Sequence, residues 1–461
     1  MKRNFQSLML LFSMGAFSQQ EASNWYFGEN AGIKFNSNGT VTALTDGQLN
    51  TDEGCASLSD ANGNLLFYTD GITVYNRNHA VMSNGTGLLG NYSSSQSAII
   101  VPKPGSSNLF YIFTLDYEAN VNGFRYSVVD LNLDGNLGAV TNQKNTLIYT
   151  PSNEKISVVR HSNGIDFWVV THAWNSNSFY SYLLSSAGLS NSPIISNVGT
   201  IIGSAPENAW GCMKISPNGK KIALASSLIN CQLFDFDTIT GVILNPQTLI
   251  NTNGSYGVEF SPNSEVLYVS FNDPRPAKII QFSLIEANIV ASATNFTIPQ
   301  TFFGTLQLGP DNKIYISQIF ENKLTVINNP DTIGTGCNFQ LNAIDLAGRM
   351  CLQGLPNFQS SYFFSPAIQL TNSCVGQASS FSLNTSQTVS NAIWDFGDGG
   401  TAAGLTPSHT YTSANNYTVT VTATTANGTG INTRNIVVSA TPAATQPSAM
   451  AICDTNNDGF A

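Results

Sequence analysis

The side chains that could perform chemistry in this sequence are few and far apart. Only four histidines occur, and two of them lie in a predicted turn or in a C-terminal hairpin motif, which leaves His79 and His172. These two fall in different predicted units, so a zinc or iron site built on several imidazoles is not expected. The motifs of nucleophile-elbow hydrolases, zinc proteases, P-loop proteins and dinucleotide-binding enzymes do not occur. The sequence therefore predicts a protein without catalysis and without a cofactor.

Carboxylates leave one catalytic alternative open. Glycoside hydrolysis needs two suitably spaced acids, and Glu53, Asp70, Asp116 and Asp273 lie on predicted loops. Loop acids are usually solvated. A carbohydrate-active or lactone-cleaving enzyme, acting as a hydrolase or lyase, is thus an alternative to a binding protein, and a purely structural spacer is a second alternative.

The same loops also carry aromatic and basic residues, which favours a binding face. Aromatic rings beside carboxylates and amides suit stacking on sugars or on peptide side chains. We predict a binding or adhesion scaffold that recognises an extracellular glycan or protein, although the two tryptophans could instead pack between sheets. The predicted binding residues are Glu53, Asp70, Asp116, His172, Trp174, Trp210, Asp273 and Arg275.

The elements that must position these loops are short and regularly repeated. Runs of β-branched and aromatic residues alternate with Asn-Gly, Pro-Asn and Asp-Asn turns, and helical periodicity is almost absent. Six units share a polar turn followed by a strand. Those strands read LLFYT, LFYIF, FWVVT, KIALA, VLYVS and KIYIS. Such recurrence is typical of a β-propeller, whereas a pair of ordinary β-sandwiches would not explain it.

A seventh unit can be assembled from the two ends of this region. Three strands within residues 25–44 lack a first strand, and Leu355–Ser361 reads as a first strand without successors. Pairing them closes the ring and removes exposed sheet edges. We therefore predict an all-β protein in which residues 24–366 form a seven-bladed β-propeller.

A different pattern follows the propeller. The stretch 393–399 reads Ile-Trp-Asp-Phe-Gly-Asp-Gly, and it is followed by Pro407–Tyr411 and by the alternating Asn416–Thr422. These motifs closely resemble the polycystic-kidney-disease (PKD) domain. The resemblance implies an immunoglobulin-like β-sandwich over residues 374–440, with the tryptophan in its core. It also implies a spacer or interaction module.

Two aspartates of this motif could be mistaken for a metal site. Asp395 and Asp398 stand in a Gly-rich turn, where aspartate commonly shapes the turn and faces solvent. We interpret both as turn residues.

The N-terminus and the charge indicate the compartment and the class of partner. Residues 1–18 combine a basic start, a short apolar run and small residues, as in a cleavable signal peptide. No later segment is apolar enough to cross a membrane. The net charge is −10, and nucleic-acid binding depends on Lys and Arg. We expect a secreted or outer-surface protein that does not bind nucleic acid.

The C-terminal residues 441–461 are predicted to be a linker and the start of a truncated further module. Asp454, Asn456 and Asp458 match the first half of a D-x-N-x-D-G calcium loop, which needs a later bidentate acid. Calcium is thus a possible ligand at this end. The segment Gly354–Phe363 and this ending are similar to surface proteins of gliding bacteria that use type IX secretion. That resemblance implies the corresponding secretion machinery as a partner, although no C-terminal sorting domain is visible.

Seven cysteines occur, so an odd one is left over within the chain. Cys337 and Cys351 flank a predicted loop and are the candidate disulfide pair. Closing a loop of that size contributes roughly 3 kcal/mol. Cys55 and Cys212 occupy equivalent positions in two units, and we expect them to be buried free thiols.

Overall fold

The computed structural model describes residues 20–298, 301–363, 367–384, 389–425 and 428–440. The predicted signal peptide and the calcium half-loop at Asp454, Asn456 and Asp458 lie outside these residues. Within them the chain is almost entirely β-strand, so the predicted all-β class is confirmed. The short 3₁₀-helices are η1 (Gln20–Ala22), η2 (Asp134–Asn136), η3 (Pro206–Ala209), η4 (Val290–Ser292), η5 (Gly334–Cys337) and η6 (Ser360–Phe363).

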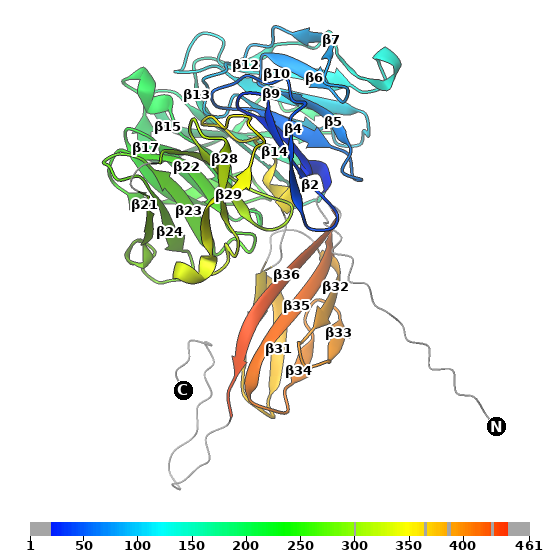
Figure 1. Ribbon diagram of the computed structural model, residues 1–461, viewed down its shortest axis with the longest axis vertical. Coiled ribbons are helices and arrows are strands. Elements are labelled where there is room, and N and C mark those ends of the chain that lie inside the picture. Colours follow the sequence, from blue (N-terminus) through cyan, green and yellow to red (C-terminus); the bar gives the residue numbers. More distant parts are fainter. Residues whose placement is uncertain (1–19, 299–300, 364–366, 385–388, 426–427, 441–461) are drawn as a thin grey trace, which may run out of the picture.

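Residues 20–363, which we call the sheet domain, form a succession of antiparallel sheets (Figure 1). The N-terminal sheet has three strands: β1 (Asn24–Phe27), β2 (Ala31–Phe35) and β3 (Val41–Leu44). The next strands in order are β4 (Ala56–Ser59), β5 (Leu65–Thr69), β6 (Thr73–Asn76) and β7 (Val81–Thr86). They are followed by β8 (Ala98–Pro102), β9 (Leu109–Leu115) and β10 (Phe124–Asp130), with β11 (Ala139–Val140) and β12 (Thr146–Tyr149) both paired to β10. A single parallel bridge between β7 and β11 joins these two groups into one sheet.

Four further sheets repeat the same antiparallel meander. One contains β13 (Ser152–Arg160), β14 (Phe167–Ala173) and β15 (Ser176–Ser185), with β16 (Gly188–Leu189) and β17 (Ile194–Ile202) paired to β15. The next contains β18 (Met213–Ile215), β19 (Lys221–Ser226), β20 (Asn230–Phe236) and β21 (Ile243–Ile250). The last two contain β22 (Ser255–Phe260), β23 (Val266–Phe271), β24 (Lys278–Ser283) and β25 (Thr294–Thr297), then β26 (Phe303–Leu308), β27 (Ile314–Gln318), β28 (Lys323–Ile327) and β29 (Phe339–Asp345). The six recurring strand motifs fall in β5, β9, β14, β19, β23 and β27, as expected.

The recurring Ser-Pro-Asn turns repeat one hydrogen-bond pattern. In the β18–β19 turn, Ser216 Oγ donates to Asn218 Oδ1 at 2.8 Å and accepts the N–H of Lys221 at 3.0 Å. In the β22–β23 turn, Ser261 Oγ donates to Asn263 Oδ1 at 2.7 Å in the same way. The serine and asparagine side chains thus satisfy turn groups that a two-strand ladder leaves unpaired.

The first strands of successive sheets contact one another, and a C-terminal segment connects the last sheet to the early ones. The N–H of Thr305 in β26 donates to the carbonyl of Gln353 at 2.8 Å, and Asn357 donates to the carbonyl of Cys55 at 2.8 Å. Glu29, just after β1, donates to the carbonyl of Met350 at 3.0 Å. The two ends of the sheet domain therefore lie side by side.

Leu355–Ser361 does not form the regular strand that the sequence predicts. It makes one parallel bridge, between Pro356 and Cys55, and then enters η6, which packs on β13. The reason is that the segment turns inward, where Asn357 and Ser361 also bond to β13 and β18, so its hydrogen bonds are divided among several sheets and form no ladder with one strand.

The C-terminal sandwich has two sheets. One contains β30 (Ala367–Leu370), β31 (Ala378–Asn384) and β34 (Ser408–Thr410), and the other contains β33 (Thr401–Ala403), β32 (Val389–Asp395), β35 (Asn415–Thr425) and β36 (Gly428–Val438). Trp394 is fully buried between them, as expected, and its Nε1–H donates to the carbonyl of Gly404 at 2.8 Å. Asp395 and Asp398 accept backbone N–H groups within their turn, also as expected, and Asp398 lies 2.7 Å from His409.

The predicted disulfide between Cys337 and Cys351 is wrong. Both thiols are free and fully buried. Cys337 ends η5, whereas Cys351 forms a backbone bridge with Glu321 and lies near Cys55, so the two do not face each other across a loop. Cys55 and Cys212 are buried free thiols, which confirms that expectation, and Cys374 is disulfide-bonded.

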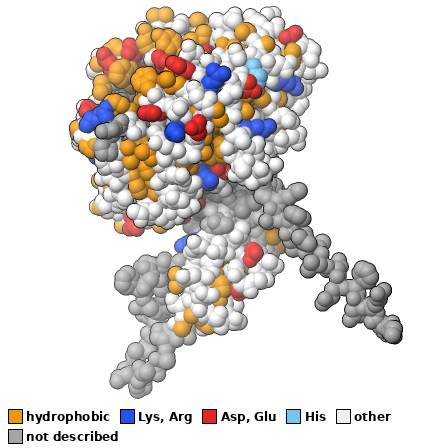
Figure 2. Space-filling model, viewed as in Figure 1, with side chains coloured by type: hydrophobic (Ala, Val, Ile, Leu, Met, Phe, Trp, Pro, Cys, Tyr) orange, Lys and Arg blue, Asp and Glu red, His pale blue; other side chains and the backbone are white. Residues whose placement is uncertain are grey.

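The visible surface carries scattered charges with uncharged and hydrophobic side chains between them (Figure 2). Ile194, Ile195 and Ile201 of β17 are 40%, 55% and 63% exposed. In the described part of the chain, none of the helices has the length and apolar character that crossing a bilayer requires.

Candidate functional site

Four of the predicted binding residues lie along one continuous rim of loops. We call residues 174–175, 203–210, 227–228, 253–254, 272–277 and 302–303 the loop rim. Its neighbouring loops are joined by hydrogen bonds: Ser227 N–H donates to the carbonyl of Trp210 at 2.9 Å, and Gly254 N–H donates to that of Ser227 at 2.6 Å. Asn272 continues the chain of contacts, since its N–H donates to the carbonyl of Gly254 at 2.9 Å and its side-chain amide donates to Phe303 at 2.7 Å.

The rim presents side chains suited to recognition. Asp273 and Arg275 are exposed, whereas Trp174 and Trp210 are half-buried. Trp174 packs partly against the hydrophobic core between β14 and β19, so only part of its ring is offered to a ligand. The structure therefore brings these four residues onto one surface.

Arg275 adopts a stacked conformation on this rim. Its guanidinium carbon lies 3.4 Å from the centre of the Phe302 ring. Stacking leaves the planar N–H donors at the edge of the guanidinium facing outward, where they can form paired hydrogen bonds. Phe302 is itself 43% exposed, so the pair presents an apolar face beside a cationic edge.

The other four predicted residues do not form a binding surface. His172 is 1% exposed within β14, and burial together with nearby Lys155 lowers its pKa to about 3. Asp70 accepts the N–H groups of Ile72 and Thr73 at 2.8 and 2.7 Å. His172 is thus committed to the fold because it lies on the buried face of β14. Asp70 is committed because its carboxylate binds backbone N–H groups of the turn that follows it.

Asp116 is committed in the same way, whereas Glu53 is half-buried beside a second acid. Asp116 accepts the N–H groups of Tyr117 and Asn122 at 3.0 Å each, which shapes the β9–β10 loop. Burial and the neighbouring Glu154 raise the pKa of the Glu53 carboxyl well above its ordinary value. The Asp116 side chain is therefore occupied by its own loop.

A loop between β7 and β8 fills the centre of the sheet domain, beside the first strands of successive sheets. The side chain of Gln96 accepts the N–H groups of Ile156 and Met213 at 3.1 and 2.9 Å, and donates to the Met213 carbonyl at 3.1 Å. Ser95 Oγ donates to Glu154 at 2.8 Å. This loop therefore ties β8, β13 and β18 together across the interior.

Glu154 and Lys155 hold the same region together. Glu154 accepts the N–H groups of Ser95 and Glu118, both at 2.7 Å. The ammonium of Lys155 donates to the carbonyl of Ala209 in η3 at 2.6 Å, and burial lowers the pKa of this lysine to about 8. The carboxylate of Glu154 is thus held inside a hydrogen-bonded network.

The C-terminal segment also reaches the interior, where Asn357 bonds to Ile156 and Lys214. The cavity bordered by Gln96, Lys214, Gln307 and Asn357 has a volume of about 10 Å³, which accommodates about one water molecule. Among the described residues, no group of three or more His, Cys, Asp or Glu side chains is arranged to hold a metal ion.

Sequence reasoning missed three exposed apolar side chains near the rim. Phe320 is 73% exposed, Leu228 is 45% exposed, and Phe302 stacks on Arg275. A signal for Phe302 was present, because alternation along a strand places one of the adjacent Phe302 and Phe303 outward. Nothing in the sequence pattern singles out Leu228 or Phe320.

Comparison with protein families assigns the C-terminal sandwich. Residues 365–440 match the PKD domain family. This part of the chain is a PKD domain. The match begins at residue 365 rather than at 374, because β30 belongs to the sandwich and pairs with β31. The PKD1 domain of Epp from Vibrio anguillarum is similar, with 29% identity over 16% of this chain and 95% of that one, at a TM-score of 0.15.

The sheet domain is distantly similar to several solved structures. A protein described as a candidate 6-phosphogluconolactonase from Bacteroides fragilis shares 12% identity, covering 72% of this chain and 97% of that one at a TM-score of 0.42. A luciferin-regenerating enzyme shares 14% identity, covering 74% and 94%, at 0.35. No curated protein matches the chain. Structures named as enzymes are thus among those similar to the sheet domain, at identities too low to assign an activity, and they do not support the prediction of a protein without catalysis.

Proposed function

We propose that this chain is an exported, outer-surface binding protein that recognises an extracellular glycan or protein through the loop rim. In this proposal the sheet domain is a seven-bladed β-propeller, closed by β1–β3 and the segment 353–357. The PKD domain acts as a spacer or adhesion module behind it. Export follows the type IX route, which is used by the surface proteins of gliding bacteria that this sequence resembles.

The observation that carries the proposal is the Arg275–Phe302 stack on the rim. Arginine and aromatic side chains dominate the energetics of recognition sites, because they combine large contact area with directed hydrogen bonds. Trp174 and Trp210 lie along the same rim, whereas the centre of the sheet domain is filled. This arrangement supports the rim as the recognition surface.

Export is supported by cysteine chemistry as well as by the N-terminal sequence. Cys374 is disulfide-bonded. Disulfides form and persist mainly in oxidising compartments such as the periplasm and the cell exterior. The free cysteines Cys55, Cys212, Cys231, Cys337 and Cys351 are all buried, so they can stay reduced there.

A glycan array probed with the secreted chain tests the proposal. We expect a defined subset of glycans to bind and the double substitution Trp174→Ala/Trp210→Ala to abolish that binding while the far-ultraviolet spectrum stays unchanged. Ile239→Ala, at a 68% exposed position on the β20–β21 turn away from the rim, is the control. If the array is negative, cross-linking to outer-surface proteins tests a protein ligand, and a chain that captures neither class contradicts the proposal.

A further inference from the structure

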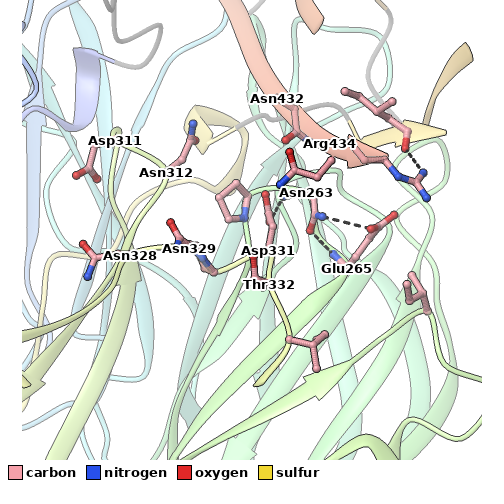
Figure 3. Close-up of a pocket in the computed structure, with 16 residues that line it drawn as sticks. Asn263, Glu265, Asp311, Asn312, Asn328, Asn329, Asp331, Thr332, Asn432 and Arg434 are labelled. Carbon is pink, nitrogen blue, oxygen red and sulfur yellow. Dashed lines mark hydrogen bonds between the residues drawn. The ribbon is translucent and has the colours of Figure 1, made fainter. Parts of the chain in front are cut away.

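A groove lies between the sheet domain and the PKD domain (Figure 3). One wall consists of the β22–β23 turn, the β26–β27 turn and the segment 328–333 that follows β28. The other wall is formed by β36 and by Ile368 of β30. Its volume is about 750 Å³, within the range of small-molecule and oligosaccharide sites.

We propose that this groove is a second binding site, separate from the loop rim, and that it takes a neutral saccharide chain. Six of the sixteen residues that line it are asparagines. An asparagine amide carries both donors and an acceptor, as does each sugar hydroxyl, so amides and vicinal hydroxyls can pair in either direction. Asn263, Asn312 and Asn329 come from the sheet domain, whereas Asn432 and Asn435 come from β36.

The polar groups of the groove are held in place before any ligand arrives. The side-chain oxygen of Asn263 accepts the N–H of Glu265 at 2.9 Å, and the backbone N–H of Asn263 donates to the carboxylate of Asp331 at 3.0 Å. Across the groove, Arg434 donates to the carbonyl of Ile368 at 2.7 Å, as Figure 3 shows. Groups fixed in this way need little ordering on binding, which favours affinity.

Apolar side chains complete the lining. Ile285 is 70% exposed and Ile333 is 45% exposed, and Pro262 and Pro330 lie beside them in the groove. A saccharide ring has C–H faces as well as hydroxyl edges. A groove with apolar patches between amides therefore matches both surfaces of such a ring.

The charge of the groove argues against anionic ligands. Glu265, Asp311 and Asp331 contribute three carboxyl groups against the single guanidinium of Arg434. Burial raises the pKa of all three acids, that of Asp331 to about 6, although Lys313 beside Asp311 and Arg434 beside Glu265 act in the opposite direction. An anion placed there would be repelled, whereas hydroxyl groups can donate to these carboxyl oxygens.

Isothermal titration of the full chain with hexaoses of glucose, mannose and xylose tests the proposal. We expect at least one to bind saturably. Asn435→Trp, at an exposed position of β36, fills the groove and weakens binding by about tenfold or more. Asn312→Gly removes an amide from the opposite wall at a position with φ of 60°, which glycine accepts, and weakens binding as well.

Two controls separate this site from the loop rim and from misfolding. Asn391→Trp places the same bulk at an exposed position of β32 outside the groove, and Arg275→Ala alters only the rim. Both are expected to leave hexaose binding unchanged. Three results would overturn the proposal: no hexaose binds the unmodified chain, Asn435→Trp binds as well as Asn391→Trp, or a lysine-rich peptide binds the groove in place of the hexaoses.

Discussion

The ammonium of Lys214 lies 3.5 Å from the carboxylate of Glu259, and the two side chains are only 7% and 5% exposed. Lys214 also donates to the side-chain oxygens of Gln307 and Asn357. One buried cation thereby connects β18, β22, β26 and the C-terminal segment that reaches the interior. Burial raises the pKa of Glu259 even though Lys214 acts in the opposite direction.

We predict that Lys214→Met lowers the free energy of unfolding by about 3–5 kcal/mol, because it leaves the Glu259 carboxylate buried and unpaired. The double substitution Lys214→Met/Glu259→Leu is expected to recover most of this loss, since apolar residues can replace a buried pair at little cost. Urea unfolding of the three chains measures both effects. Equal destabilisation of the single and double variants contradicts this explanation.

Glu53 provides a pH-dependent prediction. Burial and Glu154 raise the pKa of its carboxyl in the folded chain above the ordinary value of 4.5. The folded state then binds more protons than the unfolded state, so stability falls as the pH rises from about 4.5 through the folded-state pKa. This loss of stability amounts to about 1.4 kcal/mol for each unit by which the folded-state pKa exceeds the unfolded-state pKa, and Glu53→Gln is expected to remove it.

The measurement is the free energy of unfolding between pH 5 and pH 8. The variant is expected to be nearly equal to the unmodified chain at the acidic end and more stable at pH 8. Glu286→Gln, at an exposed position, is the matched control and is expected to follow the unmodified curve. Parallel curves for Glu53→Gln and the unmodified chain are the opposing result.

The two domains have separate tryptophan cores, which predicts separable unfolding. Trp394 is fully buried in the PKD domain, and Trp25 is fully buried against Phe35, Tyr315 and Phe358 in the sheet domain. Substituting either by Ala is expected to cost about 3–5 kcal/mol in its own domain only. Calorimetry tests this, and a single transition that shifts equally in both variants contradicts it.

The cysteines give a chemical prediction. Cys337 and Cys351 are free thiols, so the denatured chain without reductant is expected to take up iodoacetamide at both positions. The folded chain is expected to react slowly at both, because the thiols are buried and burial raises their pKa values. Peptide mass spectrometry locates the label. If both cysteines of the denatured chain fail to take up the label, this prediction is contradicted and the two are joined by a disulfide.

Strand positions could be predicted from the sequence because local chemistry fixes them. The Ser-Pro-Asn turns satisfy their own backbone groups, as Ser216 and Ser261 show, and the strands between them alternate or run apolar. The PKD hairpin around Trp394 was equally local. The inward path of Leu355–Ser361 was not predictable in this way, because it depends on partners such as Ile156 and Lys214 far away in the chain.

The site residues were predicted less well because loop position does not determine where a side chain points. Asp70 and Asp116 follow strands in the expected manner, but each bonds to backbone N–H groups of its own loop. His172 lies at the same end and is buried by its strand. Arg275 remains on the surface because the Phe302 ring supports it, and that contact links residues of different sheets.

Arg275 tests the central claim of recognition at the loop rim most directly. The measurement is the dissociation constant of the array-selected ligand for the unmodified chain, Arg275→Ala and Arg275→Lys. We predict that Arg275→Ala weakens binding by about tenfold or more and that Arg275→Lys does not restore it, because an ammonium lacks the planar stacked donors. A dissociation constant unchanged in Arg275→Ala would place recognition elsewhere and contradict the account.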